Sequence, residues 1–135
     1  MKKTFIIDGS NVVRTLLHMN KKMNFTKEKK FSKIFLDLLG KFNNQENYNL
    51  EVYFDGPKRD INPEQDLINI LFSNNKSADD MIVNSVYDII KNYNGDVCVI
   101  TEDQNLIKRC REYGAQTWRA WSFFNSVKKA ALQYT

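Results

Sequence analysis

The sequence predicts an α/β domain built around a mainly parallel β-sheet. Short apolar runs at 4–7, 50–54 and 96–101 alternate with longer segments that have helical periodicity. Turn residues or acids end each run, as is typical of buried strands whose ends reach the surface. Short buried strands that alternate with helices are characteristic of parallel sheets covered by helices on their faces.

Each predicted strand has its own boundary signals. Residues 4–7 (TFII) run into Asp-Gly, and residues 50–54 (LEVYF) run into Asp-Gly-Pro. Residues 96–101 (DVCVIT) are rich in β-branched side chains and precede two acids. A weaker run at 115–118 follows a glycine and predicts a fourth strand.

Apolar residues recur every three or four positions between these strands, which predicts amphipathic helices. The helices are expected at about 26–42, 64–72, 78–93 and 104–113, with a last one over roughly 122–134. Pro63 precedes the second of these helices. Gly95 and Gly114 follow the third and the fourth, as glycines often do at helix ends.

The composition favours one domain over residues 1–135, because 42% hydrophobic residues can build a core in a chain of this length. No stretch approaches the ~20 apolar residues of a membrane span, and the run before Asp8 is too short for a signal peptide. Cys98 and Cys110 form no Cys-x-x-Cys pair, so we expect reduced thiols in a cytoplasmic protein. The net charge of +4 only weakly suggests a polyanionic partner.

Acids stand at the carboxyl ends of three predicted strands. Asp8 ends the first strand, Asp55 the second, and Glu102 and Asp103 follow the third. The carboxyl ends of parallel strands lie along one edge of the sheet, where α/β proteins bind their ligands. We therefore expect these acids to share that edge.

Two further acids, Asp79 and Asp80, follow the predicted N-cap Ser77 of the helix at 78–93. The helix dipole favours acids in a first turn, whatever their function. At ~100° per residue, Asp79 lies about 60° from Ile82 in the apolar stripe, and Asp80 lies about 160° away. Asp79 should thus face the sheet, where a carboxylate requires a partner or a cation. Asp80 would reach the same cation only from a tilted helix or through water.

Carboxylates that converge on one edge repel each other. A cluster of Asp8, Asp79 and Asp103 would have at least one strongly raised pKa, or would hold a hard divalent cation. Because no histidine or thiolate accompanies them, the oxygen ligands indicate Mg²⁺ or Mn²⁺. Asn11, about one helical turn beyond Asp8, could orient a ligand or a water. Such a site suits phosphodiester hydrolysis.

Three segments, FIIDGSNV, SADDMIV and VCVITEDQNLIKRCREYGA, resemble in order and spacing the motifs of NYN-domain ribonucleases in the PIN-like nuclease superfamily. The YacP-type and Regnase-type nuclease domains are the most similar, and the likeness extends from Asp8 to about Trp118. It implies a PIN-like three-layer α/β/α sandwich with a central, mainly parallel sheet of four to five strands. It also implies metal-dependent endonucleolytic cleavage of RNA.

The resemblance assigns the family's catalytic residues to five positions. The strand-end acid and its amide correspond to Asp8 and Asn11, the helix-start acids to Asp79 and Asp80, and the acid after the following strand to Asp103. The four acids are the expected ligands of Mg²⁺ or Mn²⁺, with Asp80 acting directly or through water.

The sequence departs from the family pattern just after Asp103. Relatives usually carry a second acid there, and Asn105 is the one residue polar enough to replace it. A weaker second metal site, a one-metal enzyme, and an inactive domain that binds RNA or a protein partner are therefore all open. A haloacid-dehalogenase-like phosphatase is disfavoured, because it requires an aspartate where Ser10 stands.

The expected substrate is RNA in single-stranded or loop regions. Ser10 is expected to orient water or the scissile phosphate. The candidate phosphate contacts are basic residues near the acids: Lys58, Arg59, Lys108 and Arg109. Trp118 and Trp121 could stack on bases, but a place in the core is favoured. The ribosome or a protein partner could direct the activity, and the sequence does not determine the oligomeric state.

Overall fold

A parallel β-sheet forms the centre of the computed structural model, which describes residues 3–18, 25–46, 48–61 and 68–133. Within these residues the sheet has five strands in the order β3-β2-β1-β4-β5. They are β1 (Thr4–Asp8), β2 (Asn49–Phe54), β3 (Ile68–Phe72), β4 (Val97–Ile100) and β5 (Gln116–Trp118). The chain builds outward from β1 to β3 and then crosses back to β4. The strand order therefore reverses at β1 and β4, where ligands of such sheets bind.

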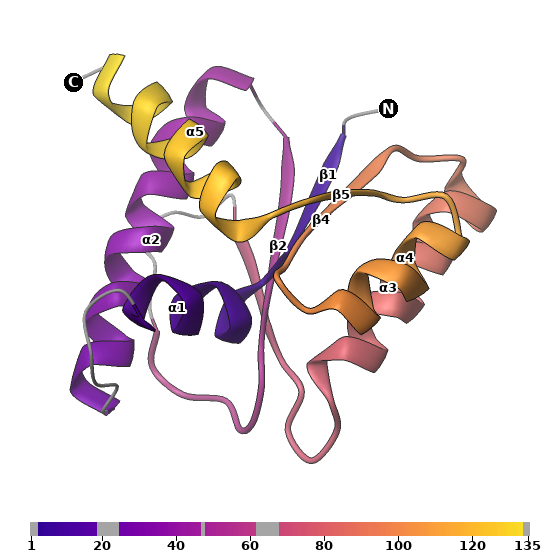
Figure 1. The fold of residues 1–135 in the computed structure, drawn as a ribbon, viewed down its shortest axis with the longest axis horizontal. Coiled ribbons are helices and arrows are strands. Elements are labelled where there is room, and N and C mark those ends of the chain that lie inside the picture. Colours follow the sequence, from indigo (N-terminus) through magenta and orange to yellow (C-terminus); the bar gives the residue numbers. More distant parts are fainter. Residues whose placement is uncertain (1–2, 19–24, 47, 62–67, 134–135) are drawn as a thin grey trace.

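Helices cover both faces of the sheet. In the described part of the chain they are α1 (Gly9–His18), α2 (Phe25–Glu46), α3 (Ala78–Tyr93), α4 (Gln104–Glu112) and α5 (Ala120–Gln133). Helices α1, α2 and α5 lie on one face, and α3 and α4 on the other (Figure 1). This is the three-layer α/β/α sandwich that the resemblance implied. None of these helices has both the length and the apolar character needed to cross a bilayer.

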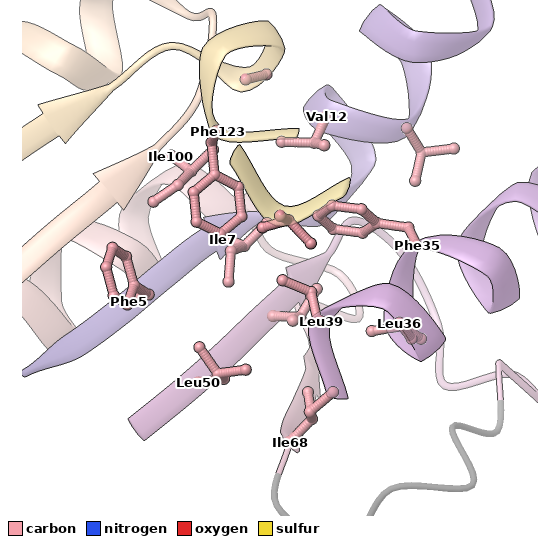
Figure 2. Packing of buried hydrophobic residues seen from close by; sticks show 14 of the residues in the cluster. Phe5, Ile7, Val12, Phe35, Leu36, Leu39, Leu50, Ile68, Ile100 and Phe123 are labelled. Carbon is pink, nitrogen blue, oxygen red and sulfur yellow. The ribbon is translucent and has the colours of Figure 1, made fainter. Parts of the chain in front are cut away.

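Alternating side chains of the strands supply a core on each side of the sheet. Phe5 and Ile7 of β1 point toward α2 and α5, where they join a cluster with Phe35 and Phe123 (Figure 2). Ile6, between them, packs on the other side against the α3 and α4 cluster. The central strand is therefore buried on both faces, which explains its continuous apolar run.

The prediction of a helix at 64–72 is wrong. Residues 62–67 lie outside the described part of the chain, and Ile68–Phe72 form β3, which pairs in parallel with β2. Apolar spacing over so short a run does not distinguish a strand from a helix, and the pairing with β2 decides it. The other predicted strands and helices are confirmed, with α3 at its predicted bounds.

Gly9 lets α1 begin directly after β1. A Cβ at this position would lie 2.9 Å from Phe54 Cε1 and 2.9 Å from the Tyr53 carbonyl oxygen. Only glycine fits this close approach of α1 to β2, so the residue that follows Asp8 is dictated by packing and not by a turn conformation.

We predict that Gly9→Ala destabilises the fold by roughly 1–3 kcal/mol, the usual cost of overpacking a core. The free energy of unfolding from urea titration measures this, with the exposed Lys41→Ala as a control that should stay within about 0.5 kcal/mol of the wild type. Equal stabilities of the two variants would contradict the prediction.

Candidate active site

Asp8 is a buried carboxylate at the carboxyl end of the central strand. Its side chain is only 3% exposed, and Thr101 Oγ1 donates a hydrogen bond to Asp8 Oδ2 at 2.9 Å. Burial raises the pKa of Asp8 from 3.8 to about 7. The hydrogen bond from Thr101 opposes this rise, and the charges of Asp79 and Asp55 add to it. The sequence predicted a strongly raised pKa within a dry cluster of acids, and loss of hydration is the largest cause of the rise at Asp8.

Thr101 and Asn11 join the turn after β4 to the start of α1. Thr101 Oγ1 lies 2.9 Å from Asp8 Oδ2 and 3.3 Å from Asn11 Oδ1. Because a hydroxyl has one hydrogen, the shorter distance assigns the donated hydrogen bond to Asp8. The same oxygen accepts a hydrogen bond from Asp103 N at 3.1 Å. Asn11 Oδ1 accepts from Glu102 N at 2.8 Å. The Asn11 amide thus positions the loop that carries Asp103, a role the sequence did not predict.

Asp103 is the N-cap of α4. Its Oδ1 accepts from Asn105 N at 2.9 Å and from Leu106 N at 3.1 Å. The cap uses one carboxylate oxygen and holds the side chain at the helix N-terminus, where the dipole favours its charge. The Asn105 side chain is exposed, and only its backbone takes part in the cap.

Asp79 and Asp80 point in different directions, as helical geometry predicted. Asp79 is half-buried, and burial raises its pKa, with further increases from the charges of Asp103 and Asp55. Asp80 is exposed, and its Oδ1 accepts from Arg109 Nη2 at 2.9 Å. Asp79 therefore belongs to the group of acids that interact electrostatically at the sheet edge, whereas Asp80 is paired beside it.

Asp55 lies on the same edge, as the strand-end pattern predicted, but it was not among the residues proposed for the site. Its Oδ1 accepts from Ala78 N at 3.1 Å, which fixes the start of α3. Its backbone N–H donates to Ser10 Oγ at 2.9 Å. The signal was present in the sequence, since an acid follows β2 just as Asp8 ends β1. Thr101 had no comparable signal.

The donor atoms suit a hard divalent cation, because the acids offer only oxygens and repel one another without a counter-charge. In the described residues, however, no group of three or more His, Cys, Asp or Glu side chains is arranged to hold a metal ion. The chemistry of the donors thus fits Mg²⁺ or Mn²⁺, but their spacing does not form a closed ligand set.

The residues expected to bind substrate fall into two groups. Lys58 and Lys108 are exposed, whereas Arg109 pairs with Asp80. Arg59 Nη2 donates to Glu28 at 2.9 Å, so this arginine is held by the protein. Ser10 accepts from a backbone N–H and ties α1 to the end of β2.

The prediction that both tryptophans lie in the core is wrong. Trp118 is 37% exposed and Trp121 is 41% exposed. The rings of Trp118 and Phe123 make a T-shaped contact with 5.6 Å between centroids, and Trp121 stacks on Phe124 at 5.9 Å. Each ring therefore packs on a phenylalanine and keeps a surface open to solvent.

Cys98 and Cys110 are buried free thiols, as expected. Burial raises the pKa of both to about 11, so neither is a thiolate at neutral pH.

Comparison with known proteins agrees with the resemblance seen in the motifs. The profile of the YacP-like NYN domain family matches residues 5–135. No curated protein sequence matches. A crystal structure of a mutant of Rae1 (YacP) from Bacillus subtilis is similar with a TM-score of 0.79 and 16% identity, over 98% of this chain and 79% of that one. A second structure of Rae1 (YacP) from Bacillus subtilis gives 0.78 and 14%, over 96% and 76%. The structures show a common fold, and the family match shows that the chain belongs to the YacP-like NYN domain family, whose members are generally nucleases.

Proposed function

We propose that the protein is an endoribonuclease that hydrolyses RNA phosphodiester bonds and depends on Mg²⁺ or Mn²⁺. The main support is Asp8, a buried carboxylate that the fold places where the strand order reverses, with the charges of Asp55 and Asp79 close enough to raise its pKa. A carboxylate kept there at a cost in stability is a candidate for function. Membership of a nuclease family supports the reaction class.

Each acid has its own role in this proposal. Asp8, Asp79 and Asp103 would hold the cation, with Asp80 contributing directly or through water. A bound Mg²⁺ or Mn²⁺ would neutralise the phosphate and lower the pKa of an attacking water. The acids must come closer together than in the described residues, where no three-ligand group is formed.

The neutral and basic residues support these acids. Asn11 holds the backbone of Glu102 and so positions the neighbouring Asp103. Lys58 and Lys108, both exposed, would attract the RNA backbone.

An inactive domain that binds RNA or a protein partner is the alternative function. It is favoured by Asn105, which stands where the family resemblance predicts a second acid and whose side chain is exposed. Incubation of the purified protein with labelled single-stranded RNA and DNA, in Mn²⁺, in Mg²⁺ and in chelator, separates the two functions. We expect cleavage of RNA with metal and none with chelator, and the absence of cleavage under all conditions would support the alternative.

We predict that Asp8→Asn lowers the rate of RNA cleavage in Mn²⁺ by at least about 100-fold. Substitution of a residue that only supports a metal ligand typically lowers activity by about 10–100-fold, and we expect a larger effect for a ligand. Asp88→Asn is a matched control, because it removes the same charge from an exposed position on α3 and should leave the rate unchanged. An Asp8→Asn enzyme as active as this control would exclude the mechanism.

We also predict that Asp8→Asn stabilises the metal-free protein at neutral and higher pH. The pKa of Asp8 is 3.8 in the unfolded chain and about 7 in the fold, so the native state holds this proton more tightly. Stability is therefore lost as the pH rises from about 4 to about 7, by at most about 4 kcal/mol at about 1.4 kcal/mol per pKa unit.

Asparagine has no such proton and can still accept from Thr101. The difference in free energy of unfolding between Asp8→Asn and wild type, measured in chelator, should grow from pH 4 to pH 7 and then level off. A variant that is less stable than the wild type at pH 8 would show that Asp8 has a structural role.

A further inference from the structure

A cavity of about 370 Å³ opens beside the acids, between α1, α2 and the loop after β2. Asp55 and Ser10 line it, and both belong to the sheet edge described above. Pro57, which is exposed, adds apolar surface, and the lining also includes Val13, which is almost fully buried. The cavity is close to the size of the smaller ligand pockets of proteins, and it is far too narrow for a nucleic-acid duplex.

Arg59 forms a fixed wall of this cavity. Its guanidinium donates to Glu28 Oε1 and to the carbonyls of Asp55 and Pro57, each at 2.9 Å. It also lies over the ring of Phe54, 5.7 Å from the centroid. Because the hydrogen bonds of Arg59 are directed to the protein, a ligand would contact the flat plane of its guanidinium group and would gain little from a new ionic contact.

Arg14 is the cation of this cavity that remains available. Its side chain is 54% exposed, Nε donates to the Ser10 carbonyl at 3.2 Å, and Nη2 lies 3.9 Å from Asp55 Oδ2. The latter distance is too long for a hydrogen bond, and an ion pair between two half-exposed groups contributes little. The outer guanidinium nitrogens can therefore turn to a phosphate, for which a planar fork is well suited.

We propose that this cavity binds one nucleotide of a single-stranded RNA next to the scissile phosphate, with Arg14 contacting the phosphate of that nucleotide. The base would lie against Pro57 and the plane of Arg59. A base enters such a space only when it is unstacked from its neighbours, so the subsite selects single strands and loops. This proposal rests on the proposed nuclease function, because it needs RNA at the acidic edge.

The test measures RNA binding in chelator, where cleavage is not required. Fluorescence anisotropy gives the Kd of a labelled single-stranded oligoribonucleotide for the wild type, Arg14→Gln and Arg111→Gln. Arg111 is a matched control, since it is an exposed arginine whose Nε also donates to one protein oxygen, Thr117 Oγ1 at 2.8 Å. Thermal melting checks that both variants fold.

We expect Arg14→Gln to raise the Kd for single-stranded RNA about tenfold, as for a lost charge-assisted hydrogen bond. The slope of log K against log salt should decrease by about 0.7, as for one lost phosphate contact. Arg111→Gln should match the wild type in both quantities. Equal Kd values for the two variants would overturn the subsite.

A duplex of the same sequence distinguishes a nucleotide subsite from a general electrostatic contact. Arg14→Gln should leave the Kd for the duplex unchanged, and an equal loss for duplex and single strand would overturn the proposal. Failure of the nuclease function is recognised separately. If the wild type binds RNA through Arg14 but does not cleave it with Mn²⁺, the subsite is supported and the nuclease function is excluded. If the wild type cleaves RNA but Arg14→Gln does not change binding, the nuclease function is supported and the subsite is excluded.

Discussion

The burial of the Asp8 carboxylate at the end of the central strand is the constraint around which this edge of the fold is arranged. A carboxylate that is 3% exposed loses most of its hydration, and the fold replaces it with one hydrogen bond from Thr101. One such bond does not restore the pKa, which stays near 7. The native protein therefore carries an acid that opposes folding whenever it is charged, and a bound cation would relieve this opposition.

The loops around Asp8 are joined by hydrogen bonds that run between elements far apart in the sequence. Asn11 accepts from the backbone after β4, Asp55 accepts from the first residue of α3, and Ser10 accepts from the backbone after β2. Each polar side chain thus ties one strand end or helix start to another. Because Gly9 lets α1 pack closely on β2, these contacts become possible within a few residues of Asp8. Polar residues that look like catalytic candidates in the sequence consequently serve first to position the acids.

The sequence predicts those features that depend on local pattern. Helix α3 and the different exposure of Asp79 and Asp80 follow from a period of 3.6 residues, and the shared edge of the acids follows from the rule for parallel strands. Features set by tertiary partners were missed. Ile68–Phe72 is a strand because β2 lies beside it, and Thr101 matters because β1 places Asp8 within reach.

The arginines illustrate the same limit and explain how an acidic edge could still receive RNA. In the sequence, Arg59 and Arg14 are equivalent cations, and only the loop residue was proposed to contact phosphate. In the fold, Glu28, two backbone carbonyls and two aromatic rings engage Arg59. Arg14 donates one hydrogen bond to the Ser10 carbonyl, and its ion pair with Asp55 is long and exposed. Arg59, which is paired and stacked, would contribute a flat contact surface to the cavity. Arg14, which is weakly paired, would contribute positive charge. Both arginines line the same cavity beside the carboxylates, so Arg14 supplies the positive charge that the proposed binding of a phosphate requires there.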